Sequence, residues 1–377
     1  MIAASLPRQR PPDAKLLMVD ASGCISHNPR STFSQFLRPG DLVIANDAAT
    51  LPASVQGVHL PTVGPIEVRL AGRRSLRVRD VREFSAIVFG PGDFHMRTED
   101  RPAPPRMMPG DRLALGPLSA TIKELLGHPR LVSLCFEGSA DEIWGGLARH
   151  GRPIQYAHIP APLAPWDVWT PIAGPPVAFE PPSAGFTLDW QALAEMHAKA
   201  VRFATVTHAA GISSTGDPEL DLRLPFDEPY RISDATAVAI RRTRADGGRI
   251  VAVGTTVVRA LEHAGRRGVI QPGEGLATQR IGSRTPLRVV DVILSGTHEP
   301  GTSHYELLRA FTSDATLRRA TDELNSHAYR THEFGDSVLI ERMRRTPTDG
   351  HHRAGAKRLA KRRWRRRIFT TVKGSCT

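Results

Sequence analysis

The second half of the chain alternates helix-like and strand-like segments, and this alternation limits the fold more than any other feature of the sequence. Helix-like patterns occupy residues 188–200, 233–247, 255–265, 303–311 and 315–328. Apolar, β-branched runs that are typical of strands occupy residues 202–208, 249–254, 286–294 and 336–341. Regular alternation of this kind predicts a layered α/β domain whose strands are largely parallel.

The first 150 residues consist instead of short strand-like runs separated by Gly and Pro-Gly turns. Their close spacing between residues 62 and 150 favours a small β-barrel or sandwich. The stretch 151–186 contains too many prolines for a long helix and is expected to form an extended connection. We therefore predict a discontinuous α/β domain, residues 1–61 plus 151–345, with an inserted small β-barrel-like domain at 62–150.

The positive charge of the chain is concentrated at its C-terminal end. The formal net charge is +12, but the segment after Gly350 carries ten Lys or Arg residues and no acid, which leaves +2 on the rest. Such a run can bind nucleic-acid phosphates without sequence preference. The same composition fits a disordered, solubilising extension. Residues 346–377 are predicted to be a disordered basic tail, and both roles stay open.

Composition argues against several other classes of protein. No apolar run approaches the roughly 18 residues that a transmembrane helix needs, and residues 1–15 lack the apolar core of a signal peptide, so we expect a cytoplasmic protein without a membrane partner. The three cysteines, Cys24, Cys135 and Cys376, show no CxxC spacing. The fifteen histidines include no HExxH pair, so no metal site is expected.

The stretch VGTTVVRALEHA, residues 253–264, places two hydroxyl groups where a strand leads into a helix. The first turn of a helix has unpaired N–H groups and the positive end of the helix dipole, which suit a carboxylate or a phosphate. Thr255 and Arg259 are four residues apart and share one helical face. Thr255, Thr256 and Arg259 are therefore candidate binding residues. The alternative is an ordinary helix cap with a surface ion pair between Arg259 and Glu262.

Other strand ends also present polar side chains. Asn46 and Asp47 follow an apolar run, His208 follows the strand-like segment 202–208, and His298 follows 286–294. Each has a structural alternative, such as an Asx-turn for Asn46 and Asp47. Because the carboxyl ends of strands form the usual binding edge of an α/β sheet, their recurrence favours one shared site.

Taken in order, these segments resemble the S-adenosylmethionine:tRNA ribosyltransferase-isomerase family of queuosine biosynthesis. VGTTVVRALE, residues 253–262, is similar to the family's VGTTSVRTLE and is the most specific match. LRPGDLVIANDAATLPA is similar to RPGDLLVVNDTRVIPAR, PPSAGFTLD to APTAGLHFT, and THEPGTSHYELLRAF to FHLPKSTLLMLVAAF. The resemblance covers nearly the whole chain apart from the basic tail.

The resemblance implies an enzyme that uses S-adenosylmethionine as a ribosyl-donating co-substrate. The family transfers and isomerises this ribosyl group onto a 7-aminomethyl-7-deazaguanine base in a tRNA anticodon. Adenine and methionine leave, and epoxyqueuosine remains. Such chemistry requires a base that removes a ribose proton near the sulfonium and an acid that assists the departure of adenine.

The resemblance also implies roles for individual residues. Thr255, Thr256, Arg259 and Asn46 are expected to bind the cofactor or a tRNA phosphate. Asp47, His208 and His298 are expected to make polar contacts or to transfer protons. The expected partner is the anticodon loop of tRNA, and the oligomeric state is not predicted.

The chain departs from the family pattern at several positions. Ala49 and Ser54 stand where the pattern has arginines, Thr187 stands where it has His, and VWTPIA at 168–173 lacks a Tyr-Gln pair. Alanine cannot replace an arginine that grips a phosphate. Two alternatives follow: an S-adenosylmethionine-dependent enzyme with a different acceptor, or a non-catalytic RNA-binding homologue.

Overall fold

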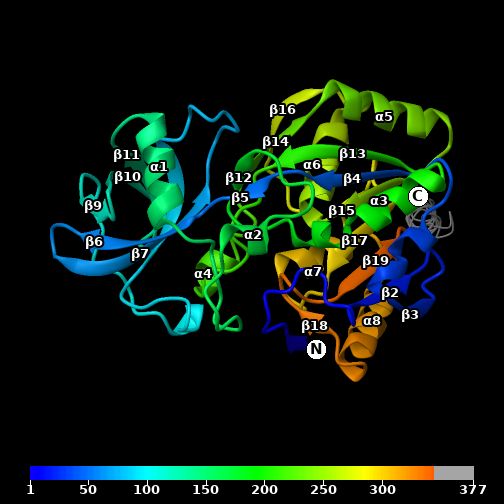
Figure 1. Cartoon of the computed structure of the whole chain (residues 1–377), viewed down its shortest axis with the longest axis horizontal. Coiled ribbons are helices and arrows are strands. Elements are labelled where there is room, and N and C mark those ends of the chain that lie inside the picture. The colour runs from blue at the N-terminus through cyan, green and yellow to red at the C-terminus, as the bar shows by residue number, and fades with distance from the viewer. Residues whose placement is uncertain (344–377) are drawn as a thin grey trace, which may run out of the picture. The chain divides into compact units, whose positions relative to one another are not determined.

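Nine strands form a mixed sheet, to which the second half of the chain contributes six strands and the first 50 residues contribute three. The protein is represented by a computed structural model, which describes residues 1–343. The strand order is β16-β14-β13-β4-β15-β17-β19-β2-β3 (Figure 1). The strands are β2 (Lys15–Val19), β3 (Ile25–Pro29), β4 (Leu42–Asn46), β13 (Arg202–His208), β14 (Glu228–Ile232), β15 (Ile250–Val253), β16 (Gly273–Ala277), β17 (Val292–Gly296) and β19 (Ser337–Glu341).

The predicted α/β architecture is confirmed, but the expectation of largely parallel strands is wrong at both margins of the sheet. The central strands β13, β4, β15 and β17 are parallel neighbours, and β19 is parallel to β2. The pairs β13–β14, β14–β16, β17–β19 and β2–β3 are antiparallel. Parallel neighbours need a long crossover, whereas a tight turn at Asp20–Cys24 joins β2 to β3. A short connection therefore accounts for the β2–β3 pair, whereas β17 and β19 are antiparallel although the long segment 297–336 joins them.

Helices cover both faces of the sheet. Alternate residues of β4 face opposite clusters, because Ile44 belongs to the core under α6 and Val43 to the core under α3. Burial on both faces explains why these strands are continuous apolar runs. The helices are α3 (Trp190–Ala198), α5 (Asp234–Ala245), α6 (Thr255–Ala264), α7 (Ser303–Leu308) and α8 (Asp314–Ser326), with 3-10 turns η1 (Arg30–Phe36), η3 (Ser183–Thr187) and η4 (Gly265–Arg267).

The first part of the chain forms a closed six-stranded barrel, drawn on the left of Figure 1. Its strand order is β10-β11-β8-β7-β6-β9, and helix α1 (Ala140–His150) follows, with a capping box between Ser139 and Glu142. The barrel-like prediction is therefore confirmed. The strands are β6 (Ser54–His59), β7 (Gly64–Gly72), β8 (Glu83–Phe89), β9 (Arg112–Leu115), β10 (Leu118–His128) and β11 (Leu131–Phe136), with η2 (Thr98–Asp100) between β8 and β9.

Residues 1–342 form one compact unit, so the predicted division into two domains stays a prediction. The first barrel strand begins at Ser54, upstream of the expected boundary at residue 62. The predicted basic tail, 346–377, lies outside the described residues. Within residues 1–343, none of the helices combines the length and apolar character that a bilayer crossing requires.

The connection 151–186 is mostly irregular, as its prolines predict. It contains one helical turn, α2, and one short strand, β12, which pairs with β5. Phe179 packs into the barrel core, and the next residue, Glu180, lines a pocket beside the sheet. The remaining short elements are β1 (Ile2–Ala3), β5 (Ala49–Thr50), α2 (Pro165–Val168), β12 (Pro176–Ala178), α4 (Pro218–Asp221) and β18 (Arg330–Thr331).

Candidate active site

A pocket of about 280 Å³ lies at the carboxyl ends of β15 and β17. Its walls are the loop 180–184, the loop 210–213, the first turn of α6 and the segment from His298 to Leu307. Apolar side chains, among them Ile212, Leu224 and Ile281, form one part of the lining, and hydroxyl, imidazole and carboxyl groups form the rest. A partly apolar cavity that also presents polar groups is the usual composition of a small-molecule site.

The first turn of α6 forms the floor of this pocket. Gly254 is the N-cap residue and has a φ of 100°, a conformation that favours glycine because it lacks a Cβ atom. The first N–H groups of any helix lack intrahelical partners, and among residues 1–343 no side chain caps those of α6. Thr255 and Thr256 both line the pocket beside these groups. The corner offers N–H donors, hydroxyl groups and the positive end of a helix dipole to one ligand.

Arg259 and Glu228 form a buried ion pair in a second wall. The guanidinium group of Arg259 pairs with the Glu228 carboxylate and donates to the carbonyl oxygens of Phe226 and Ala277, at 3.0 and 2.9 Å. Oε1 of Glu228 accepts the N–H of Gly211 at 2.7 Å. Burial raises the pKa of Glu228, while the charge of Arg259 works in the opposite direction. These contacts engage both terminal nitrogens of Arg259 and both oxygens of Glu228, whereas Nε of Arg259 has no hydrogen-bond partner within residues 1–343.

The alternative of a capped helix with a surface ion pair at Arg259 is therefore wrong. Arg259 is buried, and its partner is Glu228 rather than Glu262. The Glu262 carboxylate instead accepts backbone N–H groups of Arg288 and Val289, at 2.8 and 2.9 Å. Sequence spacing favoured Glu262 because it is three residues from Arg259, but the strand β14 supplies a closer carboxylate.

Glu180 is a buried carboxyl group that has no cationic partner among residues 1–343. Burial and, next, the negative charge of Glu333 raise its pKa to about 7. The hydroxyl oxygen of Tyr156 lies 2.5 Å from Oε1 of Glu180 and 3.1 Å from the carbonyl oxygen of Ser214. Tyr156 can therefore donate to an ionised Glu180, or accept from a protonated Glu180 while it donates to Ser214. Both protonation states of Glu180 are accommodated without a rearrangement.

Two stacked histidines, His298 and His304, also line the pocket. Nε2 of His298 lies 3.0 Å from the hydroxyl oxygen of Ser295, and the rings of His298 and His304 are 4.6 Å apart. Burial, followed by the neighbouring His304 and His332, holds the pKa of His298 well below its usual value. Burial lowers the pKa of His304 to about 4. Both imidazoles are neutral at pH 7 and can exchange hydrogen bonds with a ligand.

Of the seven predicted site residues, Thr255, Thr256, Arg259 and His298 line the pocket, and Asn46, Asp47 and His208 lie outside it. Asn46 joins β4 to β13, because its side chain donates to the carbonyl oxygen of His208 at 2.9 Å and accepts the N–H of His208 at 2.9 Å. Its Nδ2 also lies 3.4 Å from Oγ1 of Thr256. Asn46 thus supports the pocket from behind.

Asp47 and His208 are both engaged away from the cavity. The two oxygens of Asp47 accept the hydroxyl groups of Thr205 and Thr207, each at 2.7 Å. His208 is fully buried, and its Nε2 lies 3.3 Å from Oε2 of Glu228. That approach lacks hydrogen-bond geometry, and neither ring nitrogen has a hydrogen-bond partner within residues 1–343. Burial, with Arg259 nearby, holds the pKa of His208 well below its usual value.

Comparison with known proteins identifies the family. A family model described as a queuosine biosynthesis protein matches residues 1–340. The chain belongs to the queuosine biosynthesis protein family. Two curated relatives are each 30% identical to it: the S-adenosylmethionine:tRNA ribosyltransferase-isomerases of Thiobacillus denitrificans and Sorangium cellulosum. The alignments cover 89% of this chain and 93% of the first relative, and 90% and 95% for the second.

A solved structure is also similar to this member of the queuosine biosynthesis family. It is an S-adenosylmethionine tRNA ribosyltransferase from Thermotoga maritima, 22% identical, with a TM-score of 0.48. The match covers 90% of this chain and 96% of that one.

The departures from the family pattern have defined positions in the structure. Ala49 is buried in β5, and the hydroxyl of Ser54 donates to Oε1 of Glu67 in the barrel, at 2.8 Å. Thr187 is buried in η3, and its hydroxyl has no hydrogen-bond partner among the described residues. None of the three lines the pocket.

Sequence reasoning did not find Glu180, Tyr156 or His304. Glu180 stands beside the family-like PPSAG stretch, which was the one available signal, although a Glu in a Pro-rich loop is ordinarily solvent-exposed. Tyr156 belongs to a segment that has no recognisable pattern. His304 follows a Thr-Ser helix start, and its stacking on His298 depends on the fold of the loop between them.

Proposed function

We propose that this chain is an S-adenosylmethionine:tRNA ribosyltransferase-isomerase whose reaction takes place in the pocket at the first turn of α6. The proposal rests on two features that lie together in one pocket. The most specific family motif, at residues 253–262, forms the floor of a pocket that also contains a buried carboxyl group with a pKa of about 7. Membership of the queuosine biosynthesis family and the names of the relatives support the same reaction.

The pocket has the groups that S-adenosylmethionine requires. We assign the carboxylate of its methionine part to the first turn of α6, where N–H groups and the hydroxyls of Thr255 and Thr256 are available. The apolar side chains of Ile212, Leu224 and Ile281 suit the adenine ring. Arg259 acts in this proposal by neutralising Glu228, because both terminal nitrogens of its guanidinium group are engaged by Glu228 and two carbonyl oxygens.

Glu180 is the proton-transfer group in this assignment. A pKa near the working pH gives both the acid and the base form in useful amounts, which is the condition for general acid–base catalysis. In its ionised form Glu180 takes a ribose proton near the sulfonium group. In its protonated form it returns a proton to the departing adenine. Tyr156 holds the carboxyl group in place in both forms.

His298 has a supporting role, with its neutral ring donating or accepting a hydrogen bond while Ser295 orients it. Asp47 and His208, which sequence reasoning also proposed for proton transfer, are assigned structural roles. Both oxygens of Asp47 are already occupied, and His208 is sealed behind Glu228.

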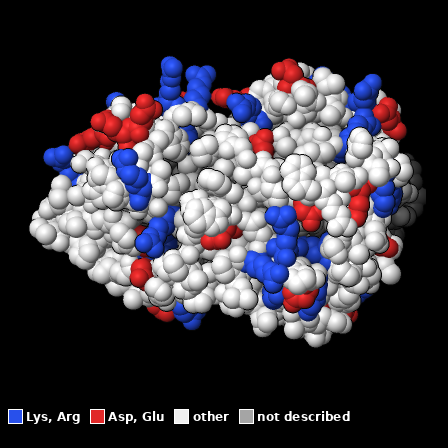
Figure 2. Space-filling model, viewed as in Figure 1, with Lys and Arg blue, Asp and Glu red and all other residues white. Residues whose placement is uncertain are grey.

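We propose that the acceptor is a 7-aminomethyl-7-deazaguanine base in a tRNA anticodon, and that the protein works in the cytoplasm. Arg280 is exposed at the rim of the pocket, where a backbone phosphate can reach it. Lys and Arg side chains are interspersed with Asp and Glu on the face drawn in Figure 2, which has one group of basic side chains toward its lower right. Phosphate contacts by a few individual arginines fit this distribution better than one extended basic surface.

The test is incubation of the full chain with S-adenosylmethionine and tRNA that carries the precursor base. We expect release of adenine and methionine and a matching mass increase at the modified base. The control is the same tRNA with unmodified guanine, which is expected to give neither product. Absence of adenine release with the precursor tRNA would refute the proposal, and release only with another nucleoside would establish a different acceptor.

A further inference from the structure

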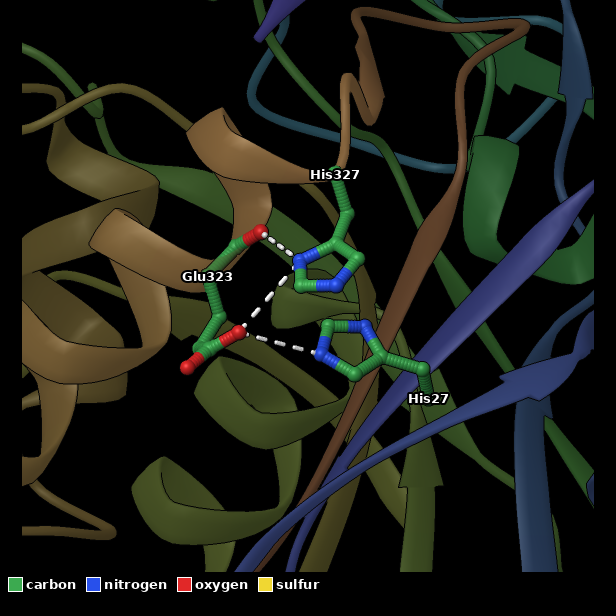
Figure 3. Close-up of side chains that lie close together, drawn as sticks. All are labelled: His27, Glu323 and His327. Atoms are coloured by element: carbon green, nitrogen blue, oxygen red, sulfur yellow. Dashed lines mark hydrogen bonds and ion pairs between the residues drawn. The ribbon is translucent and has the colours of Figure 1, made fainter.

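A group of three metal-ligating side chains lies on the surface, apart from the pocket. His27 comes from the edge strand β3, Glu323 from the last turn of α8, and His327 is the C-cap residue of that helix. Oε2 of Glu323 lies 3.2 Å from Nε2 of His27 and 3.3 Å from Nδ1 of His327 (Figure 3). None of the three residues lines the pocket.

The spacing of these atoms fits a tetrahedral metal ion. Zinc binds imidazole nitrogen and carboxylate oxygen at about 2.0–2.2 Å, so two ligands of one tetrahedral ion lie about 3.3 Å apart. The distances from Oε2 of Glu323 to the nitrogens of His27 and His327, 3.2 and 3.3 Å, are close to this value. All three ligand atoms lie within 4.8 Å of one another. Two imidazoles and one carboxylate suit a divalent transition metal better than Ca²⁺ or Mg²⁺, which prefer oxygen.

Two features of the surroundings hold the ligands in place. The hydroxyl oxygen of Tyr329 lies 3.0 Å from Nδ1 of His27. The other ring nitrogen, Nε2, is directed at Glu323 (Figure 3). A hydrogen bond on the far nitrogen is the usual way in which a metal-binding histidine is oriented. Tyr329 itself is fully buried, so its hydroxyl has a fixed position. Glu323 and His327 are one helical turn apart, which places both on the same face of α8.

The site requires small side-chain movements to close around an ion. The ring centroids of His27 and His327 lie 4.0 Å apart and the ring planes are inclined at 34°, so the rings must turn for both nitrogens to converge on one ion. The side chains are 33% and 52% exposed, which allows this rotation. Nδ1 of His327 is also 3.1 Å from the carbonyl oxygen of Glu323, so binding displaces a proton from Nδ1 and leaves Nε2 protonated.

One positive charge opposes binding. The ammonium group of Lys15 donates to the carbonyl oxygens of His327 and Ala328, at 2.6 and 3.2 Å. We therefore expect weaker binding than at a structural site with four protein ligands.

We propose that His27, Glu323 and His327 bind one divalent transition-metal ion of the zinc class, with water completing its coordination. The ion joins the edge strand β3 to the end of α8, two elements that are far apart in the sequence. The proposal is independent of the reaction in the pocket.

The test is a titration of the metal-free full chain with Zn²⁺ by calorimetry, together with the visible absorption of Co²⁺ as a probe of tetrahedral coordination. We expect His27→Gln and His327→Gln each to bind one equivalent less than the unaltered protein. His95→Gln is the matched control, because Nδ1 of His95 lies 3.0 Å from Asp93 on the surface without a third ligand. His95→Gln is expected to bind as many equivalents of Zn²⁺ as the unaltered protein.

The second His–His–Glu group of the described residues, His158, His332 and Glu333, needs its own control. The variant His332→Gln is expected to leave the Co²⁺ spectrum of the proposed site unchanged. We also expect Zn²⁺ to raise the Tm of the unaltered protein by a few degrees and to raise that of His27→Gln less. Equal stoichiometry in the unaltered protein, His27→Gln and His327→Gln would overturn the site. Loss of an equivalent without a difference in Tm would overturn the joining role.

Discussion

Two walls of the same pocket each contain a buried carboxyl group, but the two carboxyl groups have different partners. On the wall formed by β14 and α6, Glu228 is paired with Arg259 and accepts a backbone N–H group. On the wall formed by the loop 180–184, Glu180 has hydrogen-bond partners in Tyr156 and Ser213 but no cationic partner among residues 1–343, and the negative charge of Glu333 lies nearby. One carboxylate is neutralised by its partner, and the other can change its protonation state.

We infer from this difference that the wall with Glu228 stabilises the fold and that the wall with Glu180 takes part in the reaction. A buried ion pair loses much of its free energy when one partner is removed, because the other is left charged and unpaired. A buried carboxyl group without a cation reduces stability as it ionises. For Glu180 the native pKa of about 7 lies above the ordinary glutamate pKa of 4.5, so the native state holds the proton more tightly than the unfolded chain. Stability from this group is full below pH 4.5 and decreases by about 3 kcal/mol as the pH rises to 7.

The largest expected effect is on the rate of the reaction. Glu180→Gln keeps the shape of the side chain but cannot transfer a proton, so we expect adenine release to slow by about 10²–10⁴-fold. Affinity for S-adenosylmethionine, measured by calorimetry, is expected to change by no more than a few-fold. Glu306→Gln is the matched control, because Glu306 also lines the pocket but pairs with Arg309 at 2.7 Å. An equal loss of rate in both variants would contradict the assignment.

The opposite wall is tested by Glu228→Gln. We expect the free energy of unfolding, measured with urea, to fall by about 3 kcal/mol because Arg259 is left buried without its carboxylate. The double variant Glu228→Gln with Arg259→Met removes the unpaired charge and is expected to recover part of this loss. If the single variant is as stable as the unaltered protein, the two walls do not differ in the way described.

A smaller effect is expected at Asp47, which lies outside both walls. Asp47→Asn weakens the hydrogen bonds from Thr205 and Thr207, so we expect a loss of about 1–2 kcal/mol in the free energy of unfolding. Affinity for S-adenosylmethionine and the rate of adenine release are expected to stay the same. A tenfold fall in the rate of adenine release with unchanged stability would mean that Asp47 takes part in catalysis.

The smallest expected effect concerns the floor of the pocket. Thr256→Val removes one hydroxyl from the first turn of α6, and a single hydrogen bond of about 1 kcal/mol corresponds to roughly a fivefold loss of affinity for S-adenosylmethionine. Thr187→Val is the control, since Thr187 is buried away from the pocket. Equal affinities for the two variants would mean that the floor does not bind this ligand.

Local sequence patterns predicted the architecture and the floor of the pocket. Ser233 is the N-cap residue of helix α5, and its hydroxyl oxygen accepts the N–H of Thr236 as the Ser-Asp start indicated. The turn at Gly254 that brings Thr255 and Thr256 to the pocket is likewise encoded within a few residues. Such features depend on neighbours in the chain, so a single sequence is sufficient to find them.

The chemistry of the two walls depends on distant residues and could not be predicted in this way. Tyr156 meets Glu180 across a Pro-rich segment, and β14 rather than α6 itself supplies the partner of Arg259. The same limit explains why no metal site was expected, since 296 residues separate His27 from Glu323. Strand direction at the margins of the sheet also escaped prediction, because pairs such as β14–β16 and β17–β19 join segments that are about 40 residues apart in the sequence.

The most direct test of the account is the pH dependence of adenine release in a single turnover, measured for the unaltered protein and for Glu180→Gln. Removal of the ribose proton needs the ionised carboxylate, so the rate of the unaltered protein is expected to rise with pH through a midpoint near 7. In Glu180→Gln the residual rate is expected to lack this transition. A midpoint near 7 that persists in Glu180→Gln would contradict the claim that Glu180 carries the proton.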